Sequence, residues 1–267
     1  MNTATTTPAP NRHRWLGLAV ALALPLSGCG TDAPQHPSTD LSTTIPTAAA
    51  WPSSTAVPAQ PPTTDLFGNR LDVVGDEGRA LTQNPATRPS SSTGDYLTAA
   101  PARLSWQRGW GGAALPVSGS DGPAHIDHGI ASGFADTPQG AALAACDAIA
   151  RVLAAPEGVW QNVVRARFAG DTGALIARMI RSRTHTPDAA RYVTVPEGIR
   201  VRVGYRNDFA VVDIATRTAG GYAYASWPMA YDHDDWRVRL PDAIETLWEP
   251  GDLIQSLVGF GQWRTTS

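Results

Sequence analysis

Proline is distributed so unevenly that this chain of 267 residues cannot form one uniform fold. Twelve of the 22 prolines precede residue 101, in a region made largely of threonine, serine and alanine. Such a region has too few large apolar side chains to offset the entropy of ordering it. Seven of the nine tryptophans, by contrast, follow residue 100. We therefore expect a flexible tether over residues 29–94 and one folded domain over residues 95–267. Within the tether, the apolar stretch Leu66–Val74 is either a chance patch or a segment that docks on the domain.

A short apolar segment, Trp15–Leu26, follows a polar leader at the N-terminus. It is well below the ~20 residues needed to span a bilayer, so it is typical of a signal peptide. The segment ends in the string Leu26, Ser27, Gly28 and Cys29. This string resembles the lipobox of bacterial lipoproteins. The resemblance implies that residues 1–28 are a signal peptide and that acylated Cys29 anchors the protein in the lipid bilayer, on the extracytoplasmic side of the cell membrane. An ordinary signal peptide with an incidental cysteine, or an uncleaved anchor, is the alternative.

Charge and cysteine content exclude several functional classes. The formal net charge is -3, whereas an electrostatic binder of nucleic acid needs a basic excess to neutralise phosphates. Two cysteines cannot build a disulfide framework or a four-thiolate zinc site. The sequence contains no catalytic signature, and it predicts no catalytic residue, no metal and no other cofactor. We therefore expect a protein that is not an enzyme.

The first half of the domain has the pattern of helices. Thr137 followed by Pro138 predicts a helix start, because the threonine hydroxyl can accept from a free N–H and proline suits the first helical position. Apolar residues then recur at helical spacing over residues 142–153, so this helix should bury one face. A second helix follows it. Gly170 should end that helix, and Asp171 should cap a third.

The second half has the period of strands. Between Ile199 and Tyr205, apolar residues alternate with arginine, which predicts a half-buried strand. Two more strands flank a turn at Gly220–Gly221, and Trp236–Leu240 forms the last. Sequential strands joined by such short links must be antiparallel. Helices followed by an antiparallel meander indicate an α+β domain with helices on one face of the sheet.

Three strings carry a family resemblance: Gly109–Val117, Gly133–Ala145 and Trp227–Val238. They resemble an uncharacterised family of actinobacterial envelope lipoproteins, many of them encoded on conjugative or integrative elements. The order of elements resembles the nuclear transport factor 2-like cone. This resemblance implies a fold of three helices packed on a curved antiparallel sheet. The family usually has glycine where this chain has Asp234, and aspartate tolerates the positive φ of such a turn, so we expect the hairpin to persist.

Several polar side chains are of types found in catalytic or metal sites. His125 and His128 could bind a metal, but they lie on a loop without a third ligand at metal-site spacing. The acidic run Asp232–Asp235 lacks the layout of a calcium loop and fits a hairpin tip. Asp213 is either a general base in a cone pocket or a paired carboxylate. Cys146 lies on an apolar helix stripe, which indicates a buried, inert thiol.

Five arginines would share one sheet face if the first and last strands present it together: Arg200, Arg202, Arg206, Arg237 and Arg239. This set is a candidate binding face for an acidic partner or an anionic cell-wall polymer, and a solvated face is the alternative.

Together these patterns predict a non-enzymatic, membrane-anchored envelope lipoprotein. We expect it to bind another envelope protein as an accessory component of a mobile-element transfer system. Two other functions stay open: an enzyme or small-ligand binder that uses the cone pocket, and a binder of cell-wall polymer.

Overall fold

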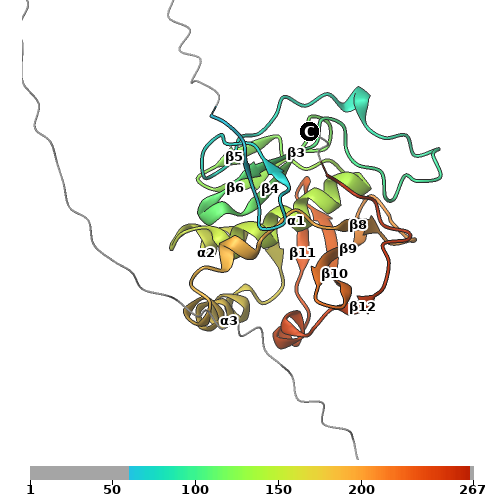
Figure 1. Ribbon diagram of the computed structural model, residues 1–267. Helices are drawn as coiled ribbons and strands as arrows, with labels where there is room; N and C mark the ends of the chain where they lie inside the picture. Colours follow the sequence, from blue (N-terminus) through green and yellow to red (C-terminus); the bar gives the residue numbers. More distant parts are fainter. Residues whose placement is uncertain (1–59, 265–267) are drawn as a thin grey trace, which may run out of the picture. The chain divides into compact units, whose positions relative to one another are not determined.

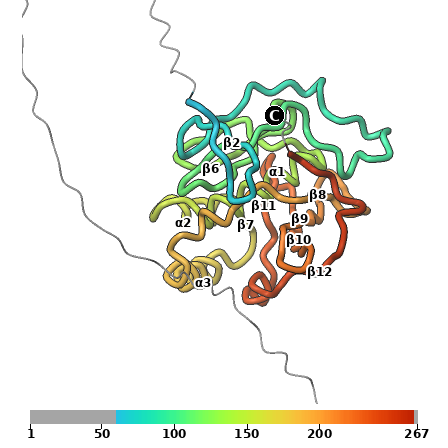
Figure 2. The backbone as a smooth tube through the Cα atoms, in the orientation of Figure 1, coloured from blue at the N-terminus to red at the C-terminus, as the bar shows by residue number. Residues whose placement is uncertain are grey.

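The computed structural model describes residues 60–264, which belong to one compact unit. A helix runs through the middle of this unit, with a layer of short β-hairpins on one side of it and a larger sheet on the other (Figure 1). Two further helices lie beside the central one, and the smooth trace in Figure 2 shows the same arrangement. The helices are α1 (Pro138–Ala154), α2 (Val159–Arg167) and α3 (Thr172–His185).

The larger sheet is mixed. Its strand order is β7-β11-β10-β9-β8, and β12 pairs with β10 beside β11. All of its pairs are antiparallel except β11 with β7, which is parallel. The strands are β7 (Phe168–Ala169), β8 (Gly198–Val201), β9 (Phe209–Thr218), β10 (Gly221–Asp232), β11 (Asp235–Arg239) and β12 (Asp252–Ile254).

The turn between β10 and β11 forms as the sequence predicted. His233 and Asp234 both have positive φ, at 53° and 60°. The residues on either side of them, Asp232 and Asp235, are paired across the two strands. The aspartate at the turn position therefore adopts the left-handed conformation that glycine would adopt there.

The hairpin layer is built from the N-terminal part of the described chain. It begins earlier than the predicted domain boundary at residue 95, because Leu71 is fully buried and Asp72 exchanges backbone hydrogen bonds with Trp106 and Arg108. Residues 60–94 thus pack on the domain and are not a tether. The strands are β1 (Thr63–Thr64), β2 (Arg70–Leu71), β3 (Ser105–Arg108), β4 (Ala114–Val117), β5 (His125–Asp127) and β6 (Ile130–Ser132).

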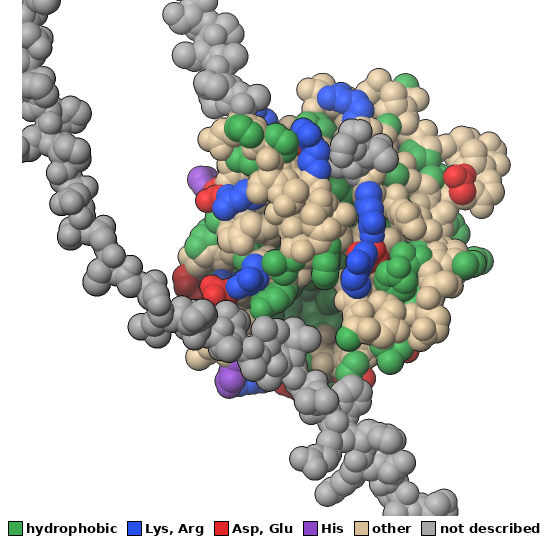
Figure 3. Space-filling view, viewed as in Figure 1, with side chains coloured by type: hydrophobic (Ala, Val, Ile, Leu, Met, Phe, Trp, Pro, Cys, Tyr) green, Lys and Arg blue, Asp and Glu red, His purple; other side chains and the backbone are tan. Residues whose placement is uncertain are grey.

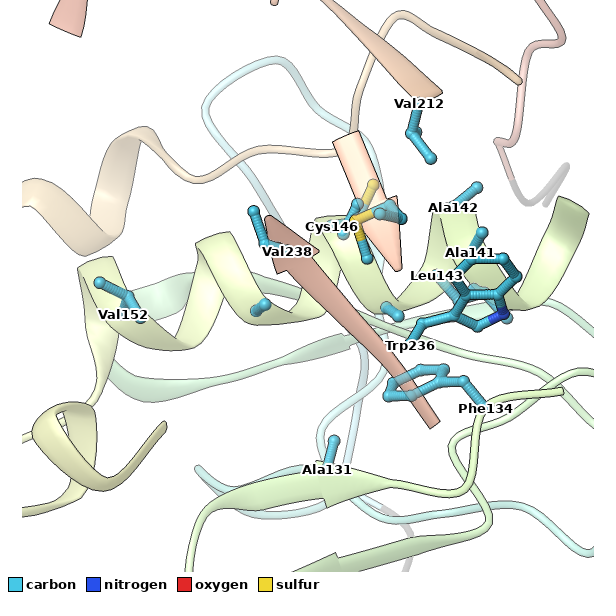
Figure 4. Packing of buried hydrophobic residues seen from close by; sticks show 14 of the residues in the cluster. Ala131, Phe134, Ala141, Ala142, Leu143, Cys146, Val152, Val212, Trp236 and Val238 are labelled. Atoms are coloured by element: carbon cyan, nitrogen blue, oxygen red, sulfur yellow. The ribbon is translucent and has the colours of Figure 1, made fainter. Parts of the chain in front are cut away.

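Helix α1 begins as the sequence predicted and is buried more completely. The Thr137 hydroxyl accepts from the Gly140 N–H at 2.9 Å. A Cβ on Gly140 would lie 2.0 Å from the Ala135 carbonyl oxygen, so only glycine fits there. Of the 17 residues in α1, 14 are buried, so the helix is covered on every side and not along one face. Figure 4 shows it between Val212 and other sheet residues on one side and Ala131 on the other.

A buried ion pair lies within this helix. The Arg151 Nε donates to Asp147 at 2.8 Å, and both side chains are fully buried. Burial raises the pKa of Asp147, and the charge of Arg151 opposes that shift. Arg151 also donates to the carbonyl oxygens of Glu77 and Gly129, at 3.0 and 3.1 Å, in the hairpin layer. The pair therefore ties the central helix to a segment distant in the sequence.

The predicted nuclear transport factor 2-like cone is wrong. Residues 60–264 form an α+β fold with three α-helices, and this part of the chain shows no curved sheet packed under helices. The reason is the hairpin layer: it covers the side of α1 that faces away from the sheet, so α1 is an inner layer and not an outer cover. The sequence predicts short edge segments at Arg103–Trp106 and Ala113–Val117, close to β3 and β4, but segments this short do not show that they form a layer over α1.

The predicted signal peptide and the lipobox residues Leu26, Ser27, Gly28 and Cys29 lie outside the described residues. Among residues 60–264, no helix is both long enough and apolar enough to cross a bilayer.

Complete burial of α1 predicts that its alanines cannot be enlarged. Ala144 is fully buried, so Ala144→Leu should lower the free energy of unfolding by roughly 1–3 kcal/mol through overpacking. Ala177→Leu, at an exposed position of α3, is the matched control and should change it by less than about 0.5 kcal/mol. Urea unfolding followed by tryptophan fluorescence measures both. Equal effects at the two sites would contradict the inner position of α1.

Candidate functional site

Asp213 is the centre of a polar cluster on the sheet face that points away from α1. The side chain is fully buried. Its carboxylate accepts from Arg200 Nε at 2.9 Å and from Arg202 Nε at 3.0 Å. It also accepts from the Ser226 hydroxyl at 2.7 Å. The side chains come from adjacent strands, because Asp213 is paired with Arg200 on one side and Ser226 on the other.

Aromatic rings hold the arginines of this cluster in place. The Arg200 guanidinium lies 4.2 Å from the ring centre of Phe260 and 5.2 Å from that of Tyr224. Two pairings of the C-terminal segment bring Phe260 to this position. Strand β12 pairs with β10, and Gly261 then forms an isolated β-bridge with Ile199 of β8. A Cβ at Gly198 would lie 2.8 Å from the Cβ of Phe260, so glycine allows this close approach. The C-terminal segment thus packs against Arg200, one of the two arginines that contact Asp213.

These contacts argue against Asp213 as a general base. A general base needs an oxygen free to take a proton, and both oxygens of Asp213 accept from arginine. The hydrogen bond to Asp213 in turn raises the pKa of Arg202. Two guanidinium groups share one carboxylate, so the cluster carries one net positive charge. Both arginines keep part of their surface in solvent, which leaves N–H groups for an acidic group outside the protein.

Exposed apolar side chains lie in the two segments that carry the cluster. Val203 and Val258 are 95% and 85% exposed, the highest values among the large hydrophobic residues of the described chain. Val203 follows Arg202, and Val258 precedes Gly259, where a Cβ would lie 3.8 Å from Arg200 Nη1. We call the surface formed by Arg200, Arg202, Val203 and Val258 the outer face. Arginine and exposed apolar groups together are typical of protein interfaces.

The five predicted arginines do not gather at one place. Arg206 pairs with Asp208 in solvent. Arg237 and Arg239 lie on β11, which is separated from β8 by β10 and β9. The sequence missed a second clamp, in which Arg217 and Arg264 both pair with the buried carboxylate of Glu197. Arg264 lies far from Glu197 in the sequence, so no local spacing indicated the contact.

The remaining polar candidates are two histidines exposed to solvent and one buried cysteine. His125 and His128 are exposed, and within residues 60–264 no group of three or more His, Cys, Asp or Glu side chains could hold a metal. Cys146 is buried, and burial raises the pKa of its thiol to about 12, which leaves it unreactive at neutral pH.

One residue of the hairpin tip at 232–235, Asp235, holds neighbouring elements together. Asp235 accepts from Arg167 Nη1 at 2.5 Å and from the backbone N–H groups of Gly133 and Phe134, at 3.0 and 3.2 Å. It thereby joins β11, α2 and the end of the hairpin layer, a role that the sequence did not indicate.

An apolar cavity of about 240 Å³ opens on the other side of the sheet. Figure 3 shows a hollow lined by hydrophobic side chains on this side of the molecule. Trp227 contributes one wall and Trp248 another. Trp227 is paired with Val212 in the core, whereas the next residue back, Ser226, points to Asp213. The cavity and the outer face therefore lie on opposite faces of the sheet. The lining is Ile149, Val152, Leu153, Phe168, Leu175, Met179, Trp227, Leu247 and Trp248.

Comparison with known proteins gives one match. The model of a domain of unknown function (DUF8175) matches residues 74–262. No curated protein and no solved structure matches the chain.

Because two arginines contact the buried carboxylate of Asp213, we predict that removing this carboxylate strongly destabilises the protein. Asp213→Ala leaves two arginines without their buried partner, so we expect the free energy of unfolding to fall by about 3 kcal/mol. The control Asp208→Ala breaks the exposed pair with Arg206 and should cost less than about 1 kcal/mol. Chemical denaturation of both variants measures the difference. A loss at Asp213 no larger than that at Asp208 would show that the cluster is not structural.

Proposed function

The chain belongs to the family defined by the domain of unknown function DUF8175, and we propose that it is a membrane-anchored envelope lipoprotein that binds a protein partner through the outer face. The family match carries no activity, so the proposal rests on the residues of this chain. We place the partner in the envelope, within a mobile-element transfer system.

The N-terminal sequence supports the anchor. The lipobox-like string ends at Cys29, directly after an apolar segment of signal-peptide length. Two or more acyl chains on one cysteine hold a protein stably at a bilayer, whereas a single chain gives only marginal binding. The resemblance of Gly109–Val117 and Trp227–Val238 to actinobacterial envelope lipoproteins points to the same location and to a mobile genetic element as the source.

The outer face carries the proposed binding activity. Val203 and Val258 expose apolar surface to water in the segments next to two arginines that are already held in place by Asp213. Preorganised side chains lose little entropy on binding, and arginine is enriched among the residues that dominate interfaces. This surface suits a protein with an acidic and partly apolar patch.

The same observation favours a protein over a cell-wall polymer. A polyanionic polymer would be matched by charge alone and would gain nothing from two exposed aliphatic side chains. A carboxylate at the centre of the cluster also lowers its attraction for a dense polyanion. We therefore favour a protein, and binding to isolated cell walls is an outcome that the experiment below can detect.

The anchor is tested by lipid labelling in the native host. Wild-type chain should incorporate radiolabelled palmitate and sediment with membranes, whereas Cys29→Ala should do neither, because the thiol that accepts the lipid is gone. Cys146→Ala is the control, and it should be labelled like the wild type, since Cys146 is buried in α1. Label that persists in Cys29→Ala would rule out this anchor.

The outer face is tested by crosslinking in the envelope. The double variant Val203→Glu with Val258→Glu places two charges on exposed positions, so it should fold normally and reduce recovery of the partner by roughly tenfold or more. Ile180→Glu, an exposed apolar position on α3, is the matched control and should keep the partner. Mass spectrometry of the crosslinked material identifies and quantifies it.

Two results would count against the outer face. In one, both sets of variants recover the partner equally. In the other, the wild-type chain crosslinks to no protein but sediments with isolated cell walls in a salt-sensitive manner, which would assign the arginines to a polymer.

A further inference from the structure

The apolar cavity is a binding site in its own right. Its walls come from helices α1 and α3, from strands β7 and β10, and from the short 3₁₀ helix η4 (Ile244–Trp248). The pocket is lined by apolar side chains, including the indole rings of Trp227 and Trp248. The rings and the aliphatic walls offer dispersion contacts to an apolar guest and would leave a polar one unsatisfied.

Charged groups are arranged at its margin. The Arg178 guanidinium lies 4.2 Å from the ring centre of Trp248, which lines the cavity. Arg178 and Arg181 both donate to the carboxylate of Glu245, at 2.7 and 3.0 Å. Two guanidinium groups share one carboxylate here too, so the margin carries one net positive charge. Arg181 is mostly exposed and has N–H groups left for an acidic group outside the protein.

From this arrangement we infer that the cavity receives one large apolar side chain of a protein partner, and that an acidic residue beside that side chain contacts Arg181. The occupant is thus a peptide segment in which leucine, phenylalanine or tryptophan is next to aspartate or glutamate.

The size of the cavity favours a side chain over a free small molecule. At about 240 Å³ it is smaller than the roughly 300–1,000 Å³ of pockets that enclose a small ligand. One apolar anchor inserted in a fitted pocket is the usual centre of a protein interface. Charge at the margin then selects partners by their acidic residues.

This site is independent of the outer face. Ser226 contacts the Asp213 cluster and Trp227 lines the cavity, so one strand presents the two sites on opposite faces of the sheet. A partner could engage either site while the other is free. Variants at each site therefore test it separately from the proposed function.

The experiment is peptide selection on the purified full-length chain. A random peptide library displayed on phage is selected on wild-type protein and counter-selected on Leu247→Trp, which fills the cavity with a larger side chain. We expect enriched peptides with a large apolar residue next to an acidic one. Synthetic peptides of that pattern should bind Leu247→Trp roughly tenfold or more weakly, as measured by fluorescence anisotropy.

Charge variants test the margin with the same peptides. Arg181→Glu should weaken binding several-fold, and added salt should weaken binding to the wild type. Arg165→Glu, an exposed arginine of α2, and Arg202→Ala on the outer face should leave the affinity unchanged. Leu153→Trp fills the cavity from α1, so it replaces Leu247→Trp if thermal unfolding shows that the latter is misfolded.

Three outcomes would overturn the inference. The first is a selection that enriches no peptide, or only peptides without the apolar and acidic pair. The second is peptide binding that neither filling variant weakens. The third is sodium laurate binding that both filling variants abolish while no peptide competes with it, which would assign the cavity to a small amphiphile.

Discussion

The burial of α1 on all sides is the constraint on which the rest of the structure depends. A helix buried in this way needs small side chains where neighbours approach closely, and Ala141, Ala142, Ala144, Ala145 and Ala148 supply them. It also needs partners for the charged groups that it carries into the core. Asp147 and Arg151 pair with each other, and Glu77 and Gly129 of the hairpin layer offer carbonyl oxygens to Arg151. The hairpin layer and the helix are therefore interdependent, although they are far apart in the sequence.

Arginine also pairs with buried carboxylates at several other places in the structure. Asp213, Asp235 and Glu197 are largely withdrawn from water, and each is paired with arginine. The sequence has 21 basic residues, and all of them are arginine. A planar guanidinium can donate in a fork to a carboxylate and still stack on a ring, as Arg167 does on Phe134 and Arg200 on Phe260. Lysine would give neither geometry, so this composition suits a core that buries acids.

Local chemistry could be predicted from the sequence, and long-range placement could not. The caps at Thr137 and Asp171 depend on residues three positions apart, and both form as expected. The left-handed turn at His233 and Asp234 follows from the short link between two strands. The cone is a wrong prediction because it rests on the order of helices and strands, and that order does not show that a second layer covers the outer side of α1. An alanine-rich helix gives a weak amphipathic signal whether one side or every side is covered, since alanine is tolerated in both settings.

The two candidate surfaces differ in how far the sequence could indicate them. Arg200 and Arg202 alternate with apolar residues, so their position on one face of a strand was predictable, and Asp213 was noted as an acid within a strand. That these three residues form one clamp depends on strand register, which no local pattern contained. The cavity could not be predicted, because its walls come from five elements, from Ile149 to Trp248 in the sequence. Its position follows from packing: α3 and η4 line it together with Trp227 of β10, and Arg178 and Arg181 of α3 both pair with Glu245 of η4 beside the opening. Adjacent residues of β10 belong to the two candidate surfaces, since Ser226 donates to Asp213 and Trp227 lines the cavity. A shift of one residue in the register of β10 would therefore exchange them.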